Sequence, residues 1–297
     1  MSVIIGTTNK NGSGSSANLT ADNGYLIEGS YLSDEISIAD YGDNSTGGYN
    51  TMYVAADSWH VETIKEAKVE GSYESITVDN IIDVTITNQS DFDVSNIEVF
   101  NAKRGNIDTS GSDSSDSIFI GVESNSISWS NMFTINTGEG DDDLTMVDFG
   151  GSKWTEFNID MGAGDDVVDI ESLGLSCYSN QERHINGGDG VDTLYTNGDS
   201  RLDIEGFEVI AGLNSEALIV DGDLLENNGS SKGLVLTGVD IQFASDLEYT
   251  VEDIEVSQAA YLNDLHYDFD DFSQVIVTVD GEEYSLLVDD PDYAYVA

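Results

Sequence analysis

The feature of this sequence that most constrains its fold is a nine-residue phrase written three times in the middle of the chain. It reads NTGEGDDDL at 136–144, DMGAGDDVV at 160–168 and NGGDGVDTL at 186–194. The copies share the pattern Gly-x-Gly-x-Asp-x-(Leu/Val), and their leading glycines lie 24 and then 26 residues apart. A phrase that recurs at a near-constant spacing predicts a chain that winds through successive, similar coils.

The chemistry of the phrase points to a metal-binding turn. Two glycines separated by one residue allow positive φ, so the backbone can turn tightly and its carbonyl oxygens can converge. The aspartate adds a charged oxygen, and the apolar residue two places later starts a strand whose side chain points inward. Carbonyl and carboxylate oxygens are hard ligands, which favour calcium over zinc or copper. Each turn offers only part of a coordination sphere, so a stacked neighbour must complete it.

These considerations predict calcium sites at three stacked turns. The side-chain ligands are the aspartates of the pattern, Asp142, Asp166 and Asp192, with Asp141 and Asp165 as secondary ligands. The glycines that shape the turns and expose carbonyl oxygens are Gly138, Gly140, Gly162, Gly164, Gly188 and Gly190. The alternative is that glycine, aspartate and asparagine are here only ordinary turn residues. Three copies, each with an apolar residue at the same offset, disfavour that alternative.

A diluted copy lies upstream at 111–118, where the sequence reads GSDSSDSI. Ser112 and Ser114 align with the two glycines of the pattern, and Ser112 lies 26 residues before Gly138. Serine is a poor substitute for glycine at positive φ. We therefore expect this coil to be structural, with Asp116 outside the main set of ligands.

The repeated skeleton resembles the nonapeptide G-G-x-G-x-D-x-U-x of the RTX (repeats-in-toxin) calcium-binding proteins. The resemblance implies an all-β fold, a calcium-loaded parallel β-solenoid or β-roll that is exported unfolded and folds outside the cell. The spacing here exceeds two tandem nonapeptides, so each coil must contain one calcium corner and a longer return. Stretches rich in threonine and valine, such as 84–88, are similar to those of secreted bacterial surface-layer and matrix proteins.

The charge of the chain limits its partners. Asp and Glu number 58 against 9 Lys and Arg, a formal net charge of -49. Binding to nucleic acid needs clustered cations, and anionic membrane surfaces repel such a chain. Two neighbouring carboxylates repel by up to about 4 kcal/mol at 4 Å in an effective dielectric near 20. Divalent cations would relieve that cost, so we expect folding to be coupled to calcium. A solvated acidic surface accounts for most acids outside the repeats.

Other features concern the cellular location. The single cysteine, Cys177, excludes an internal disulfide and a cysteine-based metal cage. No run of about 18 apolar residues exists, so we expect no membrane insertion. The first residues show no cleaved signal peptide. Residues 289–297 place acids before a short apolar stretch, which resembles the uncleaved export signal of RTX proteins that leave Gram-negative cells by type I secretion. A plain final strand is the alternative, and an extracellular or cell-surface location is the expectation.

The chain divides by composition into four parts. Residues 1–20 are rich in Gly, Ser, Asn and Thr and predict a flexible arm, and 21–75 form an N-terminal β segment. The β-solenoid with its repeats occupies 76–215, and 216–297 form a C-terminal β cap. Within the cap we predict a helix at 257–265 with Ser257 as N-cap, and a hairpin around Asp280 and Gly281. The stretch 61–69 fits a short helix or an edge strand.

Catalytic motifs are weak. There is no H-E-x-x-H, and His60, His184 and His266 lack the mutual spacing of metal ligands. Residues 229–233 fit G-x-S-x-G with Ser231 as nucleophile, but neither a strand before nor a helix after is predicted. Polysaccharide lyases and epimerases share the solenoid with RTX repeats, and Lys103-Arg104 or Arg183 would serve there as base or clamp. A uronate polymer would, however, be repelled by this charge.

The sequence therefore predicts a non-enzymatic, calcium-binding structural protein of the cell surface or extracellular matrix. Its calcium ions would rigidify the solenoid and promote self-association into a layer, fibre or matrix. Two alternatives remain open: an extracellular polysaccharide-active enzyme with a calcium-stabilised solenoid, and an adhesin.

Overall fold

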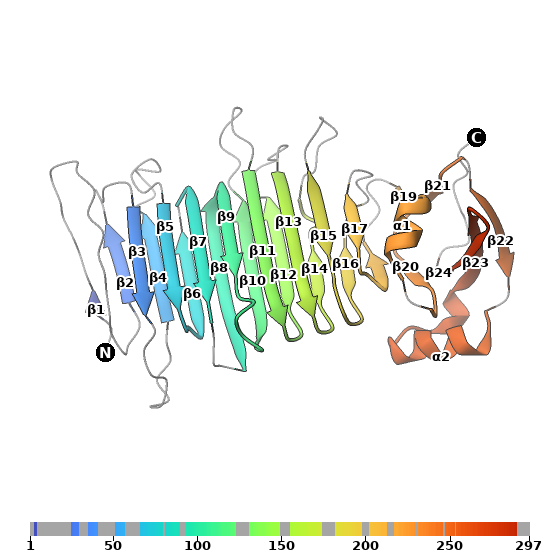
Figure 1. Ribbon diagram of the computed structural model, residues 1–297, viewed down its shortest axis with the longest axis horizontal. Helices are drawn as coiled ribbons and strands as arrows, with labels where there is room; N and C mark the ends of the chain where they lie inside the picture. Colours follow the sequence, from blue (N-terminus) through green and yellow to red (C-terminus); the bar gives the residue numbers. More distant parts are fainter. Residues whose placement is uncertain are drawn as a thin grey trace.

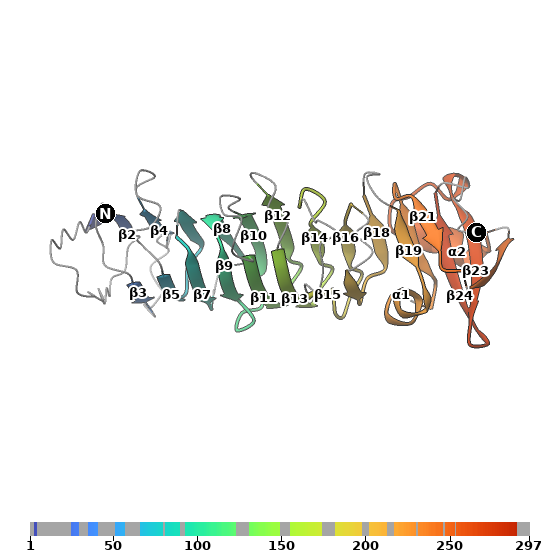
Figure 2. The ribbon, with the colours of Figure 1, turned by 90° about the horizontal axis from the view of Figure 1, so that it is seen from above.

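The chain forms an all-β, parallel β-solenoid of about 6 turns, which confirms the predicted fold class (Figure 1). The computed structural model describes residues 3–4, 25–29, 35–40, 51–56, 66–79, 81–89, 93–122, 131–148, 155–173, 182–197, 202–212, 217–229, 231–245, 247–252 and 254–289. Seen from above, the strands form two layers that run along the long axis of the molecule (Figure 2). The core lies between these layers.

The first layer, sheet A, contains fourteen strands among the described residues. In spatial order they are β1 (Val3–Ile4), β2 (Tyr25–Gly29), β4 (Thr51–Ala56), β6 (Ser75–Asp79), β8 (Val94–Ala102), β10 (Ser115–Val122), β12 (Asp143–Asp148), β14 (Val167–Asp169), β16 (Thr193–Tyr195), β18 (Val209–Ala211), β20 (Leu234–Thr237), β24 (Glu282–Val288), β23 (Ser273–Val279) and β22 (Glu248–Glu252). All neighbours are parallel up to the pair of β20 and β24, and the last three strands are antiparallel.

The second layer, sheet B, is shorter and entirely parallel over its described strands. It contains β17 (Asp203–Glu205), β15 (Arg183–Asn186), β13 (Thr155–Ala163), β11 (Asn131–Glu139), β9 (Arg104–Asp108), β7 (Asp83–Asn88), β5 (Glu66–Gly71) and β3 (Glu35–Asp40). Two further strands, β19 (Leu218–Val220) and β21 (Ile241–Phe243), form a small parallel pair. Strands from the predicted N-terminal β segment thus belong to the same two sheets as the repeats.

Period-two alternation of apolar and polar residues explains why these segments are strands that face one core. In β6 and β7 every second side chain is buried. The parallel register places inward-facing aliphatic residues of neighbouring strands next to one another. Each sheet therefore carries an inward column of aliphatic side chains between 0% and 4% exposed. In sheet A this column is Ile76, Ile97, Ile118, Leu144, Val168, Leu194 and Ile210, and in sheet B it is Val69, Ile86, Ile107, Ile135, Ile159, Ile185 and Ile204.

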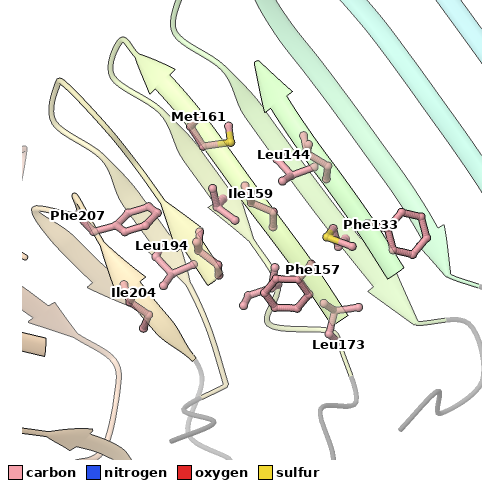
Figure 3. Packing of buried hydrophobic residues seen from close by; sticks show 14 of the residues in the cluster. Phe133, Leu144, Phe157, Ile159, Met161, Leu173, Leu194, Ile204 and Phe207 are labelled. Atoms are coloured by element: carbon pink, nitrogen blue, oxygen red, sulfur yellow. The ribbon is translucent and has the colours of Figure 1, made fainter. Parts of the chain in front are cut away.

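Aromatic and sulfur-containing side chains fill the space between the columns (Figure 3). Phe133 and Phe207 are fully buried, and Met161 lies beside the aliphatic column of sheet B. Complete burial of one such side chain contributes about 1.5–3 kcal/mol. The core therefore continues from coil to coil, and each coil depends on its neighbours to cover its two open sides.

The C-terminal cap closes the solenoid with a hairpin and two helices. Helix α1 (Gly222–Asn227) lies against β17, where the Gly206 N–H donates to the Asn227 carbonyl at 2.9 Å. Helix α2 (Val256–Asp264) covers the outer face of sheet A, with Tyr261 and Leu262 buried against Val209, Val235 and Leu287. A 3-10 helix, η1 (Phe269–Asp271), follows.

The hairpin and the helix predicted in the cap are both present, but the predicted N-cap is wrong. Strands β23 and β24 form the predicted hairpin, and Asp280 and Gly281 at its tip have φ of 50° and 90°. The predicted helix is α2, but Glu255 occupies its N-cap position and makes no side-chain cap. The prediction of Ser257 as N-cap is wrong because the helix starts earlier, and its hydroxyl donates to Gln258 Oε1 at 2.5 Å instead.

Several sequence predictions fall on other parts of the chain. The ambiguous stretch 61–69 contains the start of β5 and is a strand from Glu66 onward. Apart from β1, the predicted flexible arm lies outside the described residues, as do the export signal beyond Asp289, Cys177 and His60. None of the helices in the described ranges has both the length and the apolar character that a membrane crossing requires.

Candidate metal-binding site

The three repeats form three stacked corners between sheet B and sheet A. Each copy leaves a strand of sheet B (β11, β13 or β15) and enters one of sheet A (β12, β14 or β16). All six predicted glycines have positive φ, as expected for tight turns. The angles are 103° at Gly138, 119° at Gly140, 95° at Gly162, 149° at Gly164, 103° at Gly188 and 155° at Gly190.

A second constraint at these glycines is the close approach of neighbouring coils. A Cβ added to Gly162 would lie 2.0 Å from the carbonyl oxygen of Gly138, and one added to Gly188 would lie 1.9 Å from that of Gly162. Real Cβ atoms do not approach an oxygen so closely, so only glycine fits. The corners therefore stack with backbone directly upon backbone.

The predicted primary ligands are buried inside these corners. Asp142 is 2% exposed, and Asp166 and Asp192 are 0% exposed. Each accepts, through one carboxylate oxygen, a hydrogen bond from a backbone N–H of the preceding coil. The Asp142 N–H donates to Asp166 Oδ1 at 2.7 Å, and the Asp166 N–H donates to Asp192 Oδ1 at 2.9 Å. The stacking predicted for these aspartates is present.

The line of acids extends one coil beyond the repeats at each end. The Asp116 N–H donates to Asp142 Oδ1 at 2.7 Å, and the Asp192 N–H donates to Glu208 Oε2 at 3.0 Å. Five acids in consecutive coils thus form what we call the acid column: Asp116, Asp142, Asp166, Asp192 and Glu208. Their separations along the chain are 26, 24, 26 and 16 residues.

The sequence pattern missed Glu208, and it misaligned part of the upstream coil. Glu208 is marked by half of the pattern, Gly-x-Glu-x-Ile at 206–210, but at a shorter spacing. Upstream, Gly140 stacks over Ser114 as predicted, whereas Gly138 stacks over Ser110 rather than Ser112. The alignment of Ser112 with Gly138 is therefore wrong, because extra residues before Ser114 lengthen this corner.

Each aspartate of the acid column has one oxygen left over. The Oδ2 atoms of Asp116, Asp142, Asp166 and Asp192 are buried and have no hydrogen-bond partner within the described part of the chain. Adjacent strands lie about 4.7–4.9 Å apart, so these buried carboxylates are stacked at close range. A buried carboxylate oxygen with no partner requires a proton or a cation.

Burial raises the pKa of all three repeat aspartates. It raises the pKa of Asp166 to about 8, and the charges of Asp142 and Asp192 act in the same direction against the lowering effect of the backbone hydrogen bond. It likewise raises the pKa of Asp142 and Asp192 to about 7. The metal-free column therefore retains protons at pH values where an ordinary carboxyl is fully ionised.

A pH dependence of stability follows for the calcium-free protein. The folded pKa values of about 7 to 8 lie above the ordinary aspartate value of 3.8, so the folded state binds more protons than the unfolded state between these limits. We expect the melting temperature in chelator to fall as pH rises from about 4 to 8. Thermal unfolding followed by circular dichroism measures this fall. An Asp166→Asn variant should show a smaller fall, and an equal fall in both proteins would contradict the assignment to the column.

The predicted secondary ligands point the other way along the stack. The Asp165 N–H donates to Asp141 Oδ1 and the Val191 N–H donates to Asp165 Oδ1, both at 2.9 Å. Both aspartates are exposed. Buried and exposed aspartates thus cross-link neighbouring coils in opposite directions. Whether Asp141 and Asp165 also contact an ion stays a prediction.

Charge is arranged differently on the outer surface. One outward row of sheet B alternates acids with amides from coil to coil, so that no two acids in it are direct neighbours. Asn186 Nδ2 donates to Asp160 Oδ1 at 3.5 Å within it. The row consists of Asp108, Asn136, Asp160, Asn186 and Glu205. In this row the acids are therefore spaced apart, whereas in the acid column they are stacked directly.

The acids are not gathered into a compact cluster. Within the described ranges no three His, Cys, Asp or Glu side chains converge on one point. The column instead offers one carboxylate per coil, so an ion would be shared by two coils. The donor set fits calcium, since carboxylates stand beside glycine turns rich in carbonyl oxygens, and Ser95 and Ser114 hydroxyls reach Asp116.

The candidate catalytic side chains have other partners. Arg183 is 2% exposed and its Nε donates to the Thr155 carbonyl at 2.9 Å, while Arg104 pairs with Asp83. Ser231 lies after helix α1 and before strand β20, the reverse of the order that a nucleophile elbow requires. It lines a pocket of about 170 Å³ together with Glu283 and other residues of the cap.

His184 and His266 lie apart from the acid column. His184 stands on the outer face of sheet B, with Nδ1 2.9 Å from Asp203 Oδ2 and Nε2 3.7 Å from Glu205 Oε1. His266 is exposed just after helix α2, with φ of 68°. Neither lies in the line of carboxylates.

Comparison of the chain with models of protein families, with curated proteins and with solved structures gives no match.

Proposed function

We propose that the protein is a calcium-binding structural protein whose solenoid is rigidified by ions held along the acid column. The observation that carries the proposal is the set of buried Oδ2 atoms without partners at Asp116, Asp142, Asp166 and Asp192. The resemblance of the repeats to RTX sequences supports the same ion. The fold agrees with a β-roll type of architecture in its parallel, stacked strands.

Electrostatics support a cation rather than a column of free carboxylates. Two charges one coil apart repel by about 3 kcal/mol even at an effective dielectric of 20. Removing one partner of a buried charged pair costs about 3–5 kcal/mol, and here several charges are buried without any partner. In the outward row of sheet B, where acids alternate with amides, the repulsion between exposed carboxylates is smaller and is avoided by their spacing. Divalent cations between the coils would offset the larger cost of stacking buried carboxylates in the acid column.

The donor set favours calcium among the common cations. The column offers oxygen atoms, which are hard ligands, and the described residues place no histidine or cysteine in it. Calcium accepts six to eight oxygens in flexible arrangements, whereas magnesium requires near-ideal octahedral geometry. Turns whose carbonyls come from glycine backbone suit the more tolerant ion.

A structural role at the cell surface or in an extracellular matrix accords with this chemistry. Calcium is abundant outside cells, and a chain with a net charge of -49 resists compaction until cations arrive. An export route of the type I kind and self-association into a layer, fibre or matrix are part of the proposal. Divalent ions would also reduce the repulsion between copies of so acidic a chain.

Removal of calcium tests the proposal directly. We expect chelated protein to unfold at lower temperature than protein with calcium, because an ion at 100 times its Kd stabilises the folded state by about 2.7 kcal/mol per site. Circular dichroism and size-exclusion chromatography measure stability and compactness. Magnesium at equal concentration is the control and should stabilise less. Chelated protein that stays equally compact and heat-resistant at moderate salt would overturn the proposal.

The polysaccharide-active alternative is tested in the same samples. Acidic and neutral glycans are incubated with the protein, and new unsaturated or reducing ends are measured. Negative-stain microscopy with and without calcium then reports on assembly. Ordered, calcium-dependent assemblies without turnover support the structural role, and turnover by monomers contradicts it.

A further inference from the structure

The corner that carries Glu208 lies outside the three repeats, at the point where the solenoid passes into the cap. The pairing of β16 with β18 sets Thr193 opposite Val209, so the residues just before them, Asp192 and Glu208, stand in one line. The Val209 N–H donates to the Asp192 carbonyl at 3.0 Å, as the Thr193 N–H donates to the Asp166 carbonyl at 2.8 Å. Glu208 thus occupies the position of the pattern aspartate in a coil without the full pattern.

The acid column ends at this corner. Val209 pairs with Val235 of β20, so the next position in the line is Leu234, which is 2% exposed. An aliphatic side chain offers no oxygen to a cation. Glu208 is therefore the last carboxylate before the line becomes apolar.

Asp192 and Glu208 bring two carboxylates together in adjacent coils. Asp192 is 0% exposed, its Oδ1 is taken by the Asp166 N–H, and its Oδ2 has no partner among the described residues. Glu208 is half-buried, and its Oε2 accepts a hydrogen bond from the Asp192 N–H. The charges of Glu208, Asp165 and Asp189 all act on Asp192. Negative charge is therefore concentrated at the Glu208 end of the acid column, and no Lys or Arg is among the five residues of that column.

The backbone around Glu208 is bonded to the cap on both sides. The Phe207 carbonyl accepts the Gly229 N–H at 2.7 Å, and the Glu208 carbonyl accepts the Val235 N–H at 2.9 Å. The Phe207 N–H donates to Asn228 Oδ1 at 3.1 Å. Anything that fixes Glu208 consequently fixes the attachment of Asn228, Gly229 and Val235.

We propose that Glu208 is the terminal calcium ligand of the acid column, and that an ion held between Asp192 and Glu208 fastens the cap to the repeats. This inference rests on the proposed function, since it requires that the column binds calcium. It adds a site outside the repeated motif and a role for that site. Calcium would stabilise not only the repeats but also the junction that follows them.

Glu208→Gln tests the inference because glutamine keeps an oxygen for the Asp192 N–H and removes only the charge. Calcium bound per chain is measured by equilibrium dialysis with metal analysis. Hydrogen exchange is measured for the amides of Gly229 and Val235 with and without calcium. Glu205→Gln is the matched control, because it removes one charge from the same coil on the outer face of sheet B.

We expect Glu208→Gln to bind about one ion fewer than the parent, and to lose the calcium-induced protection of Gly229 and Val235. Glu205→Gln should match the parent in both measurements. Full stoichiometry and protection in Glu208→Gln, with an ion lost in Asp166→Asn, would overturn this inference alone. A parent protein that binds no calcium would overturn the proposed function as well.

Discussion

Replacing Asp166 with asparagine should stabilise the calcium-free protein and destabilise the calcium-loaded one. Asparagine keeps an oxygen to accept the Asp142 N–H, which lies 2.7 Å from Asp166 Oδ1. Without calcium the change removes a buried charge that is repelled from both sides. With calcium it removes a charged ligand, and a tenfold weaker affinity alone costs about 1.4 kcal/mol of stability. Urea unfolding at about pH 8.5, where the carboxylates are ionised, measures both effects.

The matched control for this variant is Asp160→Asn. Asp160 lies on the same coil and the change alters the net charge equally, but its side chain is exposed in the alternating outward row. We expect it to shift stability by no more than about 0.5 kcal/mol with or without calcium. If Asp166→Asn destabilised the protein equally in chelator and in calcium, the Asp166 carboxylate would not be a calcium ligand.

Substitution of Gly188 by alanine should strongly destabilise the protein. Its φ is 103°, and the new Cβ would lie 1.9 Å from the Gly162 carbonyl oxygen. Backbone strain and the forced separation of two coils each cost about 1–3 kcal/mol, so the melting temperature should fall by roughly 4–12 °C. Differential scanning calorimetry in saturating calcium measures the loss.

Gly281→Ala isolates the strain from the steric clash. Gly281 has a similar φ of 90°, but a Cβ there would meet nothing within 4 Å. The cost should be only about 1–2 kcal/mol. Equal losses at Gly188 and Gly281 would mean that the coils can separate freely at the corner, and that the close stacking of glycines does not constrain them.

Local chemistry made much of this fold predictable from the sequence. The Gly-x-Gly-x-Asp phrase specifies a turn, a buried acid and the start of a strand within seven residues, and all three copies behave alike. The hairpin at Asp280 and Gly281 follows from the same kind of local rule. Alternation of apolar residues gave the strands between the corners.

The extent of the acid column could not be found in this way. It depends on register between coils of unequal length, since Glu208 follows Asp192 by 16 residues whereas the repeats are 24 and 26 apart. A search for acids at the spacing of the repeats therefore does not find Glu208. The extra residues before Ser114 likewise shifted the alignment of Ser112. Ser257 was mistaken for an N-cap because a helix start depends on the preceding chain as well as on the capping residue.

The way the cap ends the two layers limits how copies of this chain can join. Sheet A passes from parallel coils into the antiparallel strands β24, β23 and β22, and sheet B ends at β17 beneath α1. The parallel winding stops at this end, because the last described strands of sheet A are antiparallel and α1 lies against β17 in sheet B. Winding that continued unbroken from one copy into the next is therefore blocked at the cap, and we expect any self-association to use other contacts.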